Sequence, residues 1–204
     1  MGGIYQKIFA KIYDPLMQGF EQGLAKNRFE LLNPLQGIVL EVGSGTGVNF
    51  QFYHPESKVI AIEPSLPMLK IAEQKAVNFP NITLYNHGVN DPEMHQIILP
   101  NSLDAITCTL VLCTIPNPEL ALQNFKKWLK PEGKLAILEH IKSENKLNGK
   151  LQEMVNPIWK MAGEGCNLTR NTDNLIRKSG FKPIESAYFH STLRWHQGIY
   201  IANV

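Results

Sequence analysis

The chain has 204 residues, of which 44% are hydrophobic and 19% are charged, a balance typical of one α/β domain with a substantial core. Its formal net charge of +2 argues against a protein that binds nucleic acid through a strongly basic surface. No apolar run is as long as a membrane span, and the sequence does not open on a secretory signal. We therefore expect residues 1–204 to form a single domain.

The three cysteines indicate a reducing compartment. The spacing of Cys108, Cys113 and Cys166 matches neither a disulfide framework nor a zinc site. We accordingly expect a cytoplasmic protein without a bound metal.

Residues 4–24 carry apolar side chains at helical spacing, with Lys7, Lys11 and Gln18 off the apolar stripe. Helical geometry is disfavoured for a residue before a proline, so Asp14-Pro15 predicts a break between two helices. One interpretation is that the two helices pack on the core. The other is that residues 1–32 form a lid over a ligand site and also touch a membrane surface.

The next segment is an apolar run, Ile38–Val42, that ends in a turn rich in glycine. Strand, glycine turn and helix form the first unit of nucleotide-binding α/β folds. The dinucleotide fingerprint G-x-G-x-x-G would need a glycine where Val48 stands, so the pattern here is G-x-G-x-G. Because Gly43, Gly45 and Gly47 lack a Cβ, a ligand can approach the backbone there.

Two acids indicate which ligand that is. Glu41 stands two positions before the first glycine, where a carboxylate would repel a pyrophosphate but can accept a hydrogen bond from an ammonium group. The turn therefore favours a positively charged nucleoside such as S-adenosylmethionine and argues against a nicotinamide-dependent reductase. The run 58–62 predicts the next strand, and Glu63 at its end lies about 20 residues after the first glycine, where an acid typically binds ribose hydroxyls.

With these two motifs, Leu40–Gly47 and Ile62–Leu69, the chain resembles the class I S-adenosylmethionine-dependent methyltransferases. The resemblance implies a Rossmann-like α/β fold, in which a mostly parallel seven-stranded sheet has helices on both faces and an antiparallel edge strand. It also implies S-adenosylmethionine as the cofactor and S-adenosylhomocysteine as the product. The cofactor-binding residues expected on this basis are Tyr13, Glu41, Gly43, Ser44, Gly45, Gly47, Asn49, Glu63, Pro64, Met68, Gly88, Val89, Asn90, Thr109 and Leu110.

The rest of the chain alternates between apolar runs and helical patterns. We expect strands at 82–85, 103–110 and 135–140, and helices at 65–77, from Asn117 to Leu129 and at 171–179. Residues 181–189 and 198–204 predict an antiparallel hairpin that closes the sheet at its edge.

Further segments look like the membrane-associated alkyl-thiol methyltransferases of animals: Cys108–Cys113, Glu139-His140, Asn156-Pro157 with Trp159, Gly165–Arg170 and Gly198–Tyr200. The glycine motif is also nearly that of bacterial phospholipid N-methyltransferases. These resemblances imply a small or lipid-like acceptor, with a thiol as the first hypothesis and an amine such as a phospholipid headgroup as the alternative. A module that binds the cofactor without catalysis is a hypothesis of another class.

Methyl transfer mainly requires that two reactants are aligned and desolvated, and it needs neither a metal nor an enzyme nucleophile. We therefore expect Cys113 and Cys166 to pack or to line a pocket. A thiol reacts as its thiolate, so a base is useful at neutral pH, and His140 is the catalytic candidate, with a structural histidine as the alternative. The expected substrate pocket comprises Cys113, Trp159, Asn167 and Arg170, and anchoring of its own loop is the alternative role of Arg170.

Three lysines, Lys142, Lys146 and Lys150, follow the expected fifth strand. Solvated surface is the ordinary interpretation of such residues. The alternative is a mildly positive face that favours peripheral contact with anionic membranes, so that the protein lies in the cytoplasm at a membrane surface.

Overall fold

The computed structural model describes residues 2–190 and 193–202, and the strands of this part of the chain form one sheet in the order β3-β2-β1-β4-β5-β7-β6. The strands are β1 (Ile38–Val42), β2 (Lys58–Ile62), β3 (Ile82–Tyr85), β4 (Leu103–Thr109), β5 (Leu129–Ile141), β6 (Phe181–His190) and β7 (Arg194–Ala202). Every pair from β3 to β5 is parallel, and β7 is antiparallel to both β5 and β6. The predicted sheet and its closing hairpin are confirmed, although β5 and β7 begin earlier than expected; residues 203–204 lie outside the described part.

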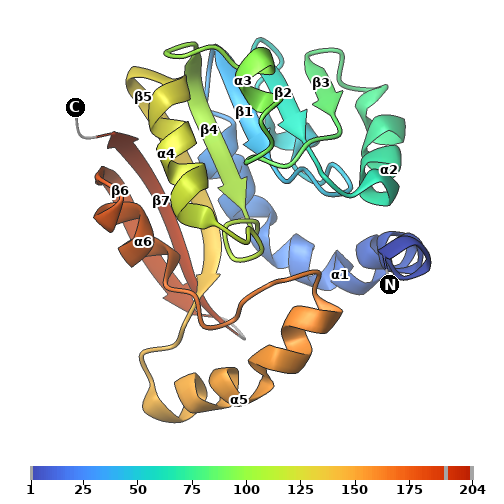
Figure 1. Cartoon of the computed structure of the whole chain (residues 1–204), viewed down its shortest axis with the longest axis vertical. Coiled ribbons are helices and arrows are strands. Elements are labelled where there is room, and N and C mark those ends of the chain that lie inside the picture. Colours follow the sequence, from blue (N-terminus) through green and yellow to red (C-terminus); the bar gives the residue numbers. More distant parts are fainter. Residues whose placement is uncertain (1, 191–192, 203–204) are drawn as a thin grey trace.

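Helices cover both faces of the sheet, as predicted (Figure 1). They are α1 (Gly2–Leu32), α2 (Leu66–Ala76), α3 (Met94–Ile97), α4 (Pro118–Trp128), α5 (Lys146–Ala162) and α6 (Thr172–Lys178), with a short 3-10 turn at Phe50–Phe52. In Figure 1, α3, α4 and α6 lie in front of the sheet and α1 passes behind it.

Alternation along the strands explains why both faces are covered. Leu40 of β1 belongs to an apolar cluster that includes Phe125 of α4, whereas the preceding residue, Val39, belongs to a second cluster with Leu31 and Leu32 of α1. Successive side chains of a strand point to opposite faces, so an unbroken apolar strand needs a partner layer on each side.

One prediction about the N-terminal segment is wrong. Pro15 lies inside α1 and does not end it, so Asp14-Pro15 does not separate two helices. The axis of α1 instead changes direction along its length (Figure 1), which is how a helix accommodates the missing N–H and the bulk of a proline ring. Asp14 contacts other elements, as described below, and these contacts favour helical geometry at Asp14 despite the proline that follows it.

The sequence did not predict α5. Its first turn is capped by Asn145, whose side chain accepts hydrogen bonds from the backbone N–H groups of Leu147 (3.0 Å) and Asn148 (3.2 Å). No helix in the described ranges is both long and apolar enough to span a bilayer.

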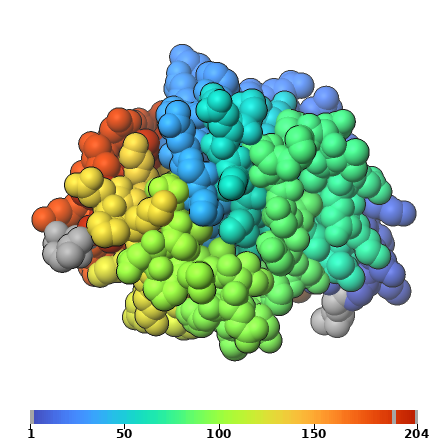
Figure 2. All heavy atoms as spheres, turned by 90° about the horizontal axis from the view of Figure 1, so that it is seen from above, coloured from blue at the N-terminus to red at the C-terminus, as the bar shows by residue number. Residues whose placement is uncertain are grey.

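The parallel strands β1, β2 and β4 all point towards the side where the first turns of α1 and the whole of α5 lie (Figure 1). Figure 2 views the molecule from the opposite end of the strands. Early segments (blue) lie there between late segments (yellow and red) and middle segments (green), because neighbours in the sheet are not neighbours in sequence. In sheets of this kind, ligands bind at the carboxyl ends of the strands. The candidate site is therefore expected at the carboxyl ends of β1 and β4, near α1 and α5.

Candidate active site

The three glycines after β1 all have positive φ, but their surroundings differ. A Cβ on Gly43 would lie 2.2 Å from Val111 Cγ2, and one on Gly47 would lie 2.4 Å from Phe50 Cε2. A Cβ on Gly45 would meet nothing within 4 Å. The sequence argument expected a ligand at all three. A side chain would find free space only at Gly45, whereas at Gly43 and Gly47 it would overlap with side chains of the chain itself.

Glu63 is tied to the same turn. Its Oε2 accepts a hydrogen bond from the Gly45 N–H (2.9 Å) and its Oε1 accepts one from the Ser65 N–H (2.8 Å). Burial raises the pKa of this carboxyl, while the two backbone hydrogen bonds oppose the rise. The carboxylate thus lies directly beside the open side of the glycine turn, where the ribose role was predicted.

A buried polar cluster lies behind the turn. Arg28 of α1 donates from Nη1 to Asn49 Oδ1 (2.5 Å) and to Thr109 Oγ1 (2.9 Å), and its Nη2 pairs with Glu21 at 2.7 Å. Asn49 in turn donates from Nδ2 to Glu41 Oε1 (2.8 Å). A charged residue of the first helix is thereby connected to the acid of the glycine motif.

Three atoms of the charged side chains in this cluster are buried without a hydrogen bond: Glu21 Oε2, which is ion-paired with Arg28, Arg28 Nε and Glu41 Oε2. For Arg28 Nε and Glu41 Oε2 no other partner is present, and the two residues are only 3% and 1% exposed. Burial raises the pKa of Glu41 to about 7, against the hydrogen bond of Asn49 and the charge of Arg28. A buried charge without a partner is costly, so a ligand with an ammonium group and a carboxylate would satisfy one atom each. The methionine part of S-adenosylmethionine carries those two groups, and the residues therefore fit it.

The space at this point is small. A cavity of about 50 Å³ is lined by Tyr13, Glu21 and Arg28 of α1 together with Gly43, Ser44, Gly45, Thr46, Val48, Asn49, Thr109 and Leu110. Pockets for ligands of this size usually hold several hundred Å³. Tyr13, Glu21 and Arg28 of α1 form one wall of this cavity.

Polar contacts hold α1 against the glycine turn. Asp14 accepts a hydrogen bond from Thr46 Oγ1 (2.5 Å) and one from Lys75 Nζ of α2 (2.7 Å). All three side chains come from different elements. This contact, called here the Asp14 latch, connects the first half of α1 to the rest of the site.

The loop after β4 is fixed from two sides. Glu139 of β5 accepts hydrogen bonds from the N–H groups of Val111 and Leu112, both at 2.7 Å. Arg170 donates from Nη1 to the carbonyls of Leu112 and Ile115. Arg170 therefore has the loop-anchoring contacts that were the alternative to substrate binding, and Glu139, which sequence reasoning gave no role, has a matching one.

That loop delivers Cys113 to a cluster with His140 and Cys166. Cys166 Sγ lies 3.7 Å from Cys113 Sγ and 3.1 Å from His140 Nε2. The hydrogen bond with Cys113, followed by the hydrogen bond and charge of His140, lowers the pKa of Cys166 against the effect of burial. Burial opposes protonation of His140, but Cys166 and Glu139 outweigh it and raise the pKa of the imidazole.

Comparison with known proteins assigns the family. A family model described as a methyltransferase domain matches residues 17–186. The chain belongs to this methyltransferase family. It is accordingly an S-adenosylmethionine-dependent methyltransferase, as the two motifs predicted.

Two relatives in sequence are described as thiol S-methyltransferases. The Homo sapiens protein Thiol S-methyltransferase TMT1A is 32% identical over 194 residues, which cover 92% of this chain and 78% of that protein. The Rattus norvegicus protein Thiol S-methyltransferase TMT1B is 33% identical over 158 residues, which cover 77% of this chain and 65% of that protein.

Solved structures confirm the fold. A putative methyltransferase from Haloferax volcanii, in complex with the Trm112 activator, has a TM-score of 0.74 at 13% identity and covers 98% of both chains. Phosphoethanolamine N-methyltransferase 2 of Haemonchus contortus, in complex with S-adenosyl-L-methionine, has a TM-score of 0.67 at 14% identity and covers 88% of this chain and 53% of that one. At such identities the likeness concerns the fold alone.

Within the methyltransferase fold, the predicted cofactor residues form two groups. The cavity is lined by seven of them, Tyr13, Gly43, Ser44, Gly45, Asn49, Thr109 and Leu110, whereas Gly47 and Glu41 lie next to this group without lining it. The turn after β3 lies next to Glu63, since Asn86 Nδ2 donates to the Glu63 carbonyl at 2.8 Å. There Gly88 donates its N–H to Asp91 (2.7 Å). The remaining residues of this second group are Pro64, which is exposed, Met68 and Val89, which are buried, and Asn90, which donates to the Asn117 carbonyl.

Sequence reasoning missed Arg28, although the sequence contains a signal for it. Arg28 lies four residues after Leu24 and four before Leu32, and both leucines are buried. Residues four apart share one face of a helix, so an arginine in an apolar stripe indicates a buried charge that needs partners. Of the predicted acceptor pocket, Trp159 is half exposed on α5, and Asn167 donates its N–H to the Cys113 carbonyl (3.1 Å).

Proposed function

We propose that this methyltransferase transfers the methyl group of S-adenosylmethionine to a thiol. The observation that carries the acceptor is the 32% identity to a human thiol S-methyltransferase over 92% of the chain. When bound, S-adenosylmethionine supplies a methyl group activated by its sulfonium. Arg28 and Glu41 would hold its amino-acid part, and Glu63 its ribose.

The chain's own part in the reaction is to align and desolvate the acceptor. Glu139 and Arg170 both form hydrogen bonds to the backbone of the loop 110–115 after β4, so the wall next to Leu110 is fixed. The role of His140 as a base stays a prediction. Its Nε2 atom forms a hydrogen bond with Cys166 and therefore does not face the acceptor freely.

The test is a transfer assay with radiolabelled S-adenosylmethionine and three acceptor sets: alkyl thiols of rising chain length, phosphoethanolamine, and none. We expect label in a thioether product, with rates that rise with chain length. The Arg28→Met variant, which loses a contact to the cofactor but none to the acceptor, serves as the inactive control. Label that enters only the amine would contradict the thiol acceptor, and a chain that binds cofactor without turnover would be a binding module.

We also propose that the acceptor is taken from a membrane surface. Residues Leu147, Leu151, Met154, Ile158 and Met161 follow each other at spacings of three or four along α5, with exposed fractions between 54% and 79%. Such a stripe is one face of the helix and would normally be buried. Lys142, Lys146, Lys150 and Lys160 accompany it in sequence, which suits anionic lipid.

A second exposed stripe lies at the start of α1, with Ile4, Ile8, Ile12 and Leu16 between 49% and 77% exposed. The Tyr5 hydroxyl donates to the Ala162 carbonyl at 2.6 Å, so the start of α1 touches the end of α5. We call the two stripes together the apolar surface.

Flotation with anionic and with neutral liposomes tests the membrane proposal. Leu151→Ser, Met154→Ser and Ile158→Ser combined should abolish flotation with anionic vesicles. The matched control replaces exposed apolar residues elsewhere, Val77→Ser with Leu99→Ser, and should float like the unaltered protein. Equal flotation of both variants, or none for the unaltered chain, would exclude membrane contact through this surface.

A further inference from the structure

Two thiol side chains and one imidazole lie close together next to the candidate active site. Cys113 lies in the loop after β4, His140 lies near the end of β5, and Cys166 lies in the turn that follows α5. One ligand atom from each, the two sulfurs and a ring nitrogen, lies within 4.8 Å of the others. The sequence spacing of these residues suggested no metal site, because the ligands come from three separate segments.

The separation of the two sulfurs fits tetrahedral coordination. Two thiolates bound about 2.3 Å from zinc lie about 3.8 Å apart, and a thiolate and an imidazole nitrogen lie about 3.5 Å apart. The two sulfurs here are 3.7 Å apart, which agrees with the first value. Cys166 Sγ is 3.1 Å from His140 Nε2, a hydrogen-bond contact that would lengthen when an ion binds between the two atoms. The sulfur separation is also far longer than a disulfide bond of about 2.05 Å. We propose that Cys113, His140 and Cys166 form a three-ligand site for a thiophilic divalent cation, zinc in the first instance.

The backbone holds the ligands in place without help from a metal. The Asn167 N–H donates to the Cys113 carbonyl (3.1 Å), which joins the two cysteine-bearing segments, and the Cys166 N–H donates to the Gly163 carbonyl (3.0 Å). His140 is fixed by the ladder between β5 and β7, where it pairs with Trp195. A site whose ligands are held independently loses less conformational entropy when the ion binds.

Thiolate and imidazole donors select the cation. Soft thiolates favour zinc and other thiophilic ions over magnesium and calcium, which prefer oxygen ligands. Three protein ligands, rather than four, are the pattern of catalytic zinc sites, whose fourth position takes water or substrate.

This open position deepens the proposed function and rests on it. Leu110 lines the cavity, and Cys113 lies three residues further along the same fixed loop. An acceptor thiol could occupy the fourth position, release its proton to water on binding, and react from there as a thiolate. In this assignment His140 is a ligand and not the base.

Titration of the metal-free, reduced full chain with Co²⁺ tests the site, because cobalt bound by thiolates in a tetrahedral site absorbs strongly. We expect saturation at one equivalent and reversal by Zn²⁺. Loss of a supporting residue already weakens metal sites about 10–100-fold, so Cys166→Ser or His140→Ala should weaken binding by at least about 100-fold. Cys108→Ala, which removes the third cysteine from outside the cluster, should bind like the unaltered chain.

A thiol titration and circular dichroism on each sample confirm that the cysteines are reduced and that every variant is folded. With three free thiols, the absence of a saturable cobalt spectrum would overturn the site. So would binding that is equal in Cys166→Ser and Cys108→Ala. Because this readout needs neither cofactor nor acceptor, it is independent of the proposed methyl transfer.

A second arm adds an alkyl thiol to the cobalt-loaded chain. A shift of the spectrum that saturates with the thiol supports the open coordination position. Cobalt binding without a shift would refute substrate ligation and leave the metal site standing.

Discussion

At the scale of single residues, the two glycines Gly43 and Gly45 share a positive φ but not their neighbours. Gly43→Ala and Gly45→Ala therefore introduce similar backbone strain, of roughly 1–2 kcal/mol. Only the first also forces a Cβ to within 2.2 Å of Val111, and overpacking of that kind costs about 1–3 kcal/mol more.

We expect Gly43→Ala to be the less stable variant in urea denaturation. Gly45→Ala should remain folded and bind S-adenosylhomocysteine at least about tenfold more weakly in calorimetry. A Gly45→Ala variant with unchanged affinity would show that no ligand occupies the open side of the turn.

Arg28 and Glu63 should recognise opposite ends of the cofactor. We expect Arg28→Met to weaken binding of S-adenosylhomocysteine by more than about tenfold, since a hydrogen bond to a charged group contributes about 1.5–3 kcal/mol. The affinity for 5′-methylthioadenosine, which lacks the amino-acid part, should stay unchanged in this variant.

Glu63→Gln, which keeps one acceptor oxygen for the glycine turn, should weaken both ligands. Calorimetry of both variants with both ligands gives four affinities. The assignment of Arg28 to the amino-acid end fails if Arg28→Met weakens both ligands equally.

At the scale of elements, the Asp14 latch should control how often the first half of α1 opens. Asp14→Ala removes the contacts to Thr46 and Lys75. Because Lys75 and Asp14 are more than one third exposed, global stability should change by less than about 1 kcal/mol. Amide hydrogen exchange of residues 4–16 should nevertheless become faster, while β1 stays protected.

The matched control is Lys26→Ala, which removes the exposed pair between Lys26 and Glu30 on the same helix. It should leave exchange in residues 4–16 unchanged. If Asp14→Ala behaves like this control, the latch does not hold α1.

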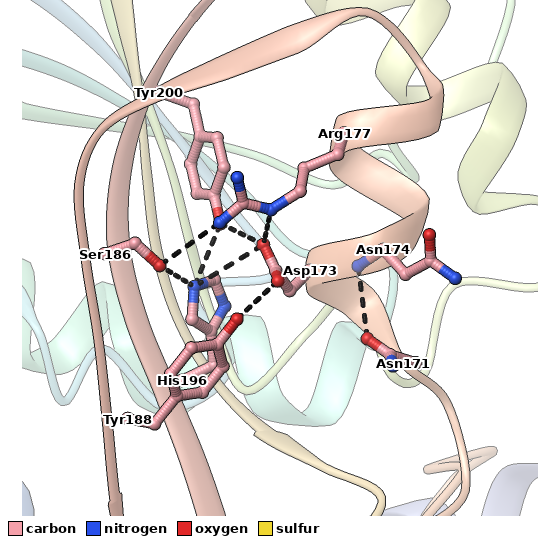
Figure 3. A network of polar contacts seen from close by, with 8 residues as sticks. All are labelled: Asn171, Asp173, Asn174, Arg177, Ser186, Tyr188, His196 and Tyr200. Carbon is pink, nitrogen blue, oxygen red and sulfur yellow. Dashed lines mark hydrogen bonds and ion pairs between the residues drawn. The ribbon is translucent and has the colours of Figure 1, made fainter.

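At the scale of the whole molecule, one polar network connects α6 to the closing hairpin (Figure 3). Asp173 accepts hydrogen bonds from the hydroxyls of Tyr188 and Tyr200, both at 2.5 Å, and from Arg177 Nε at 2.7 Å. His196 of β7 is fully buried next to them, with its Nε2 2.9 Å from the Tyr200 hydroxyl.

The pKa of His196 sets a pH dependence. Burial lowers it to about 4; Arg177 and Arg194 act in the same direction, and the charge of Asp173 opposes them. In the unfolded chain the value is about 6.5, so between pH 6.5 and 4 the unfolded state binds more protons. The stability that comes from neutral His196 is thus complete above pH 6.5 and is lost as the pH falls.

Between pH 7 and pH 5 this loss amounts to about 2 kcal/mol. Glu41 and Glu139, whose pKa values are raised to about 7 chiefly by burial, act in the opposite direction. We therefore compare the chain with His196→Asn, in which both carboxyls remain. The unaltered chain should lose about 2 kcal/mol more than the variant in urea denaturation, and parallel curves would show that His196 does not titrate on unfolding.

The positions of the strands along the chain and the two motifs were within reach of the sequence, because they depend on local patterns. Apolar runs mark buried parallel strands, and the positions of Glu41 and Glu63 relative to the glycines are set by short stretches of chain. These patterns were sufficient for the fold and the family, including the closing hairpin.

Features that depend on contacts between distant segments were decided by the tertiary structure. Pro15 stays within α1, although the local preference before a proline predicted a break. Gly43 and Gly45 look alike in sequence, and only the position of Val111 shows that Gly43 has no room for a Cβ whereas Gly45 has. The meeting of Cys113, His140 and Cys166 likewise follows from the packing of β4, β5 and the turn after α5, because no local spacing encodes a distance between residues so far apart in the chain.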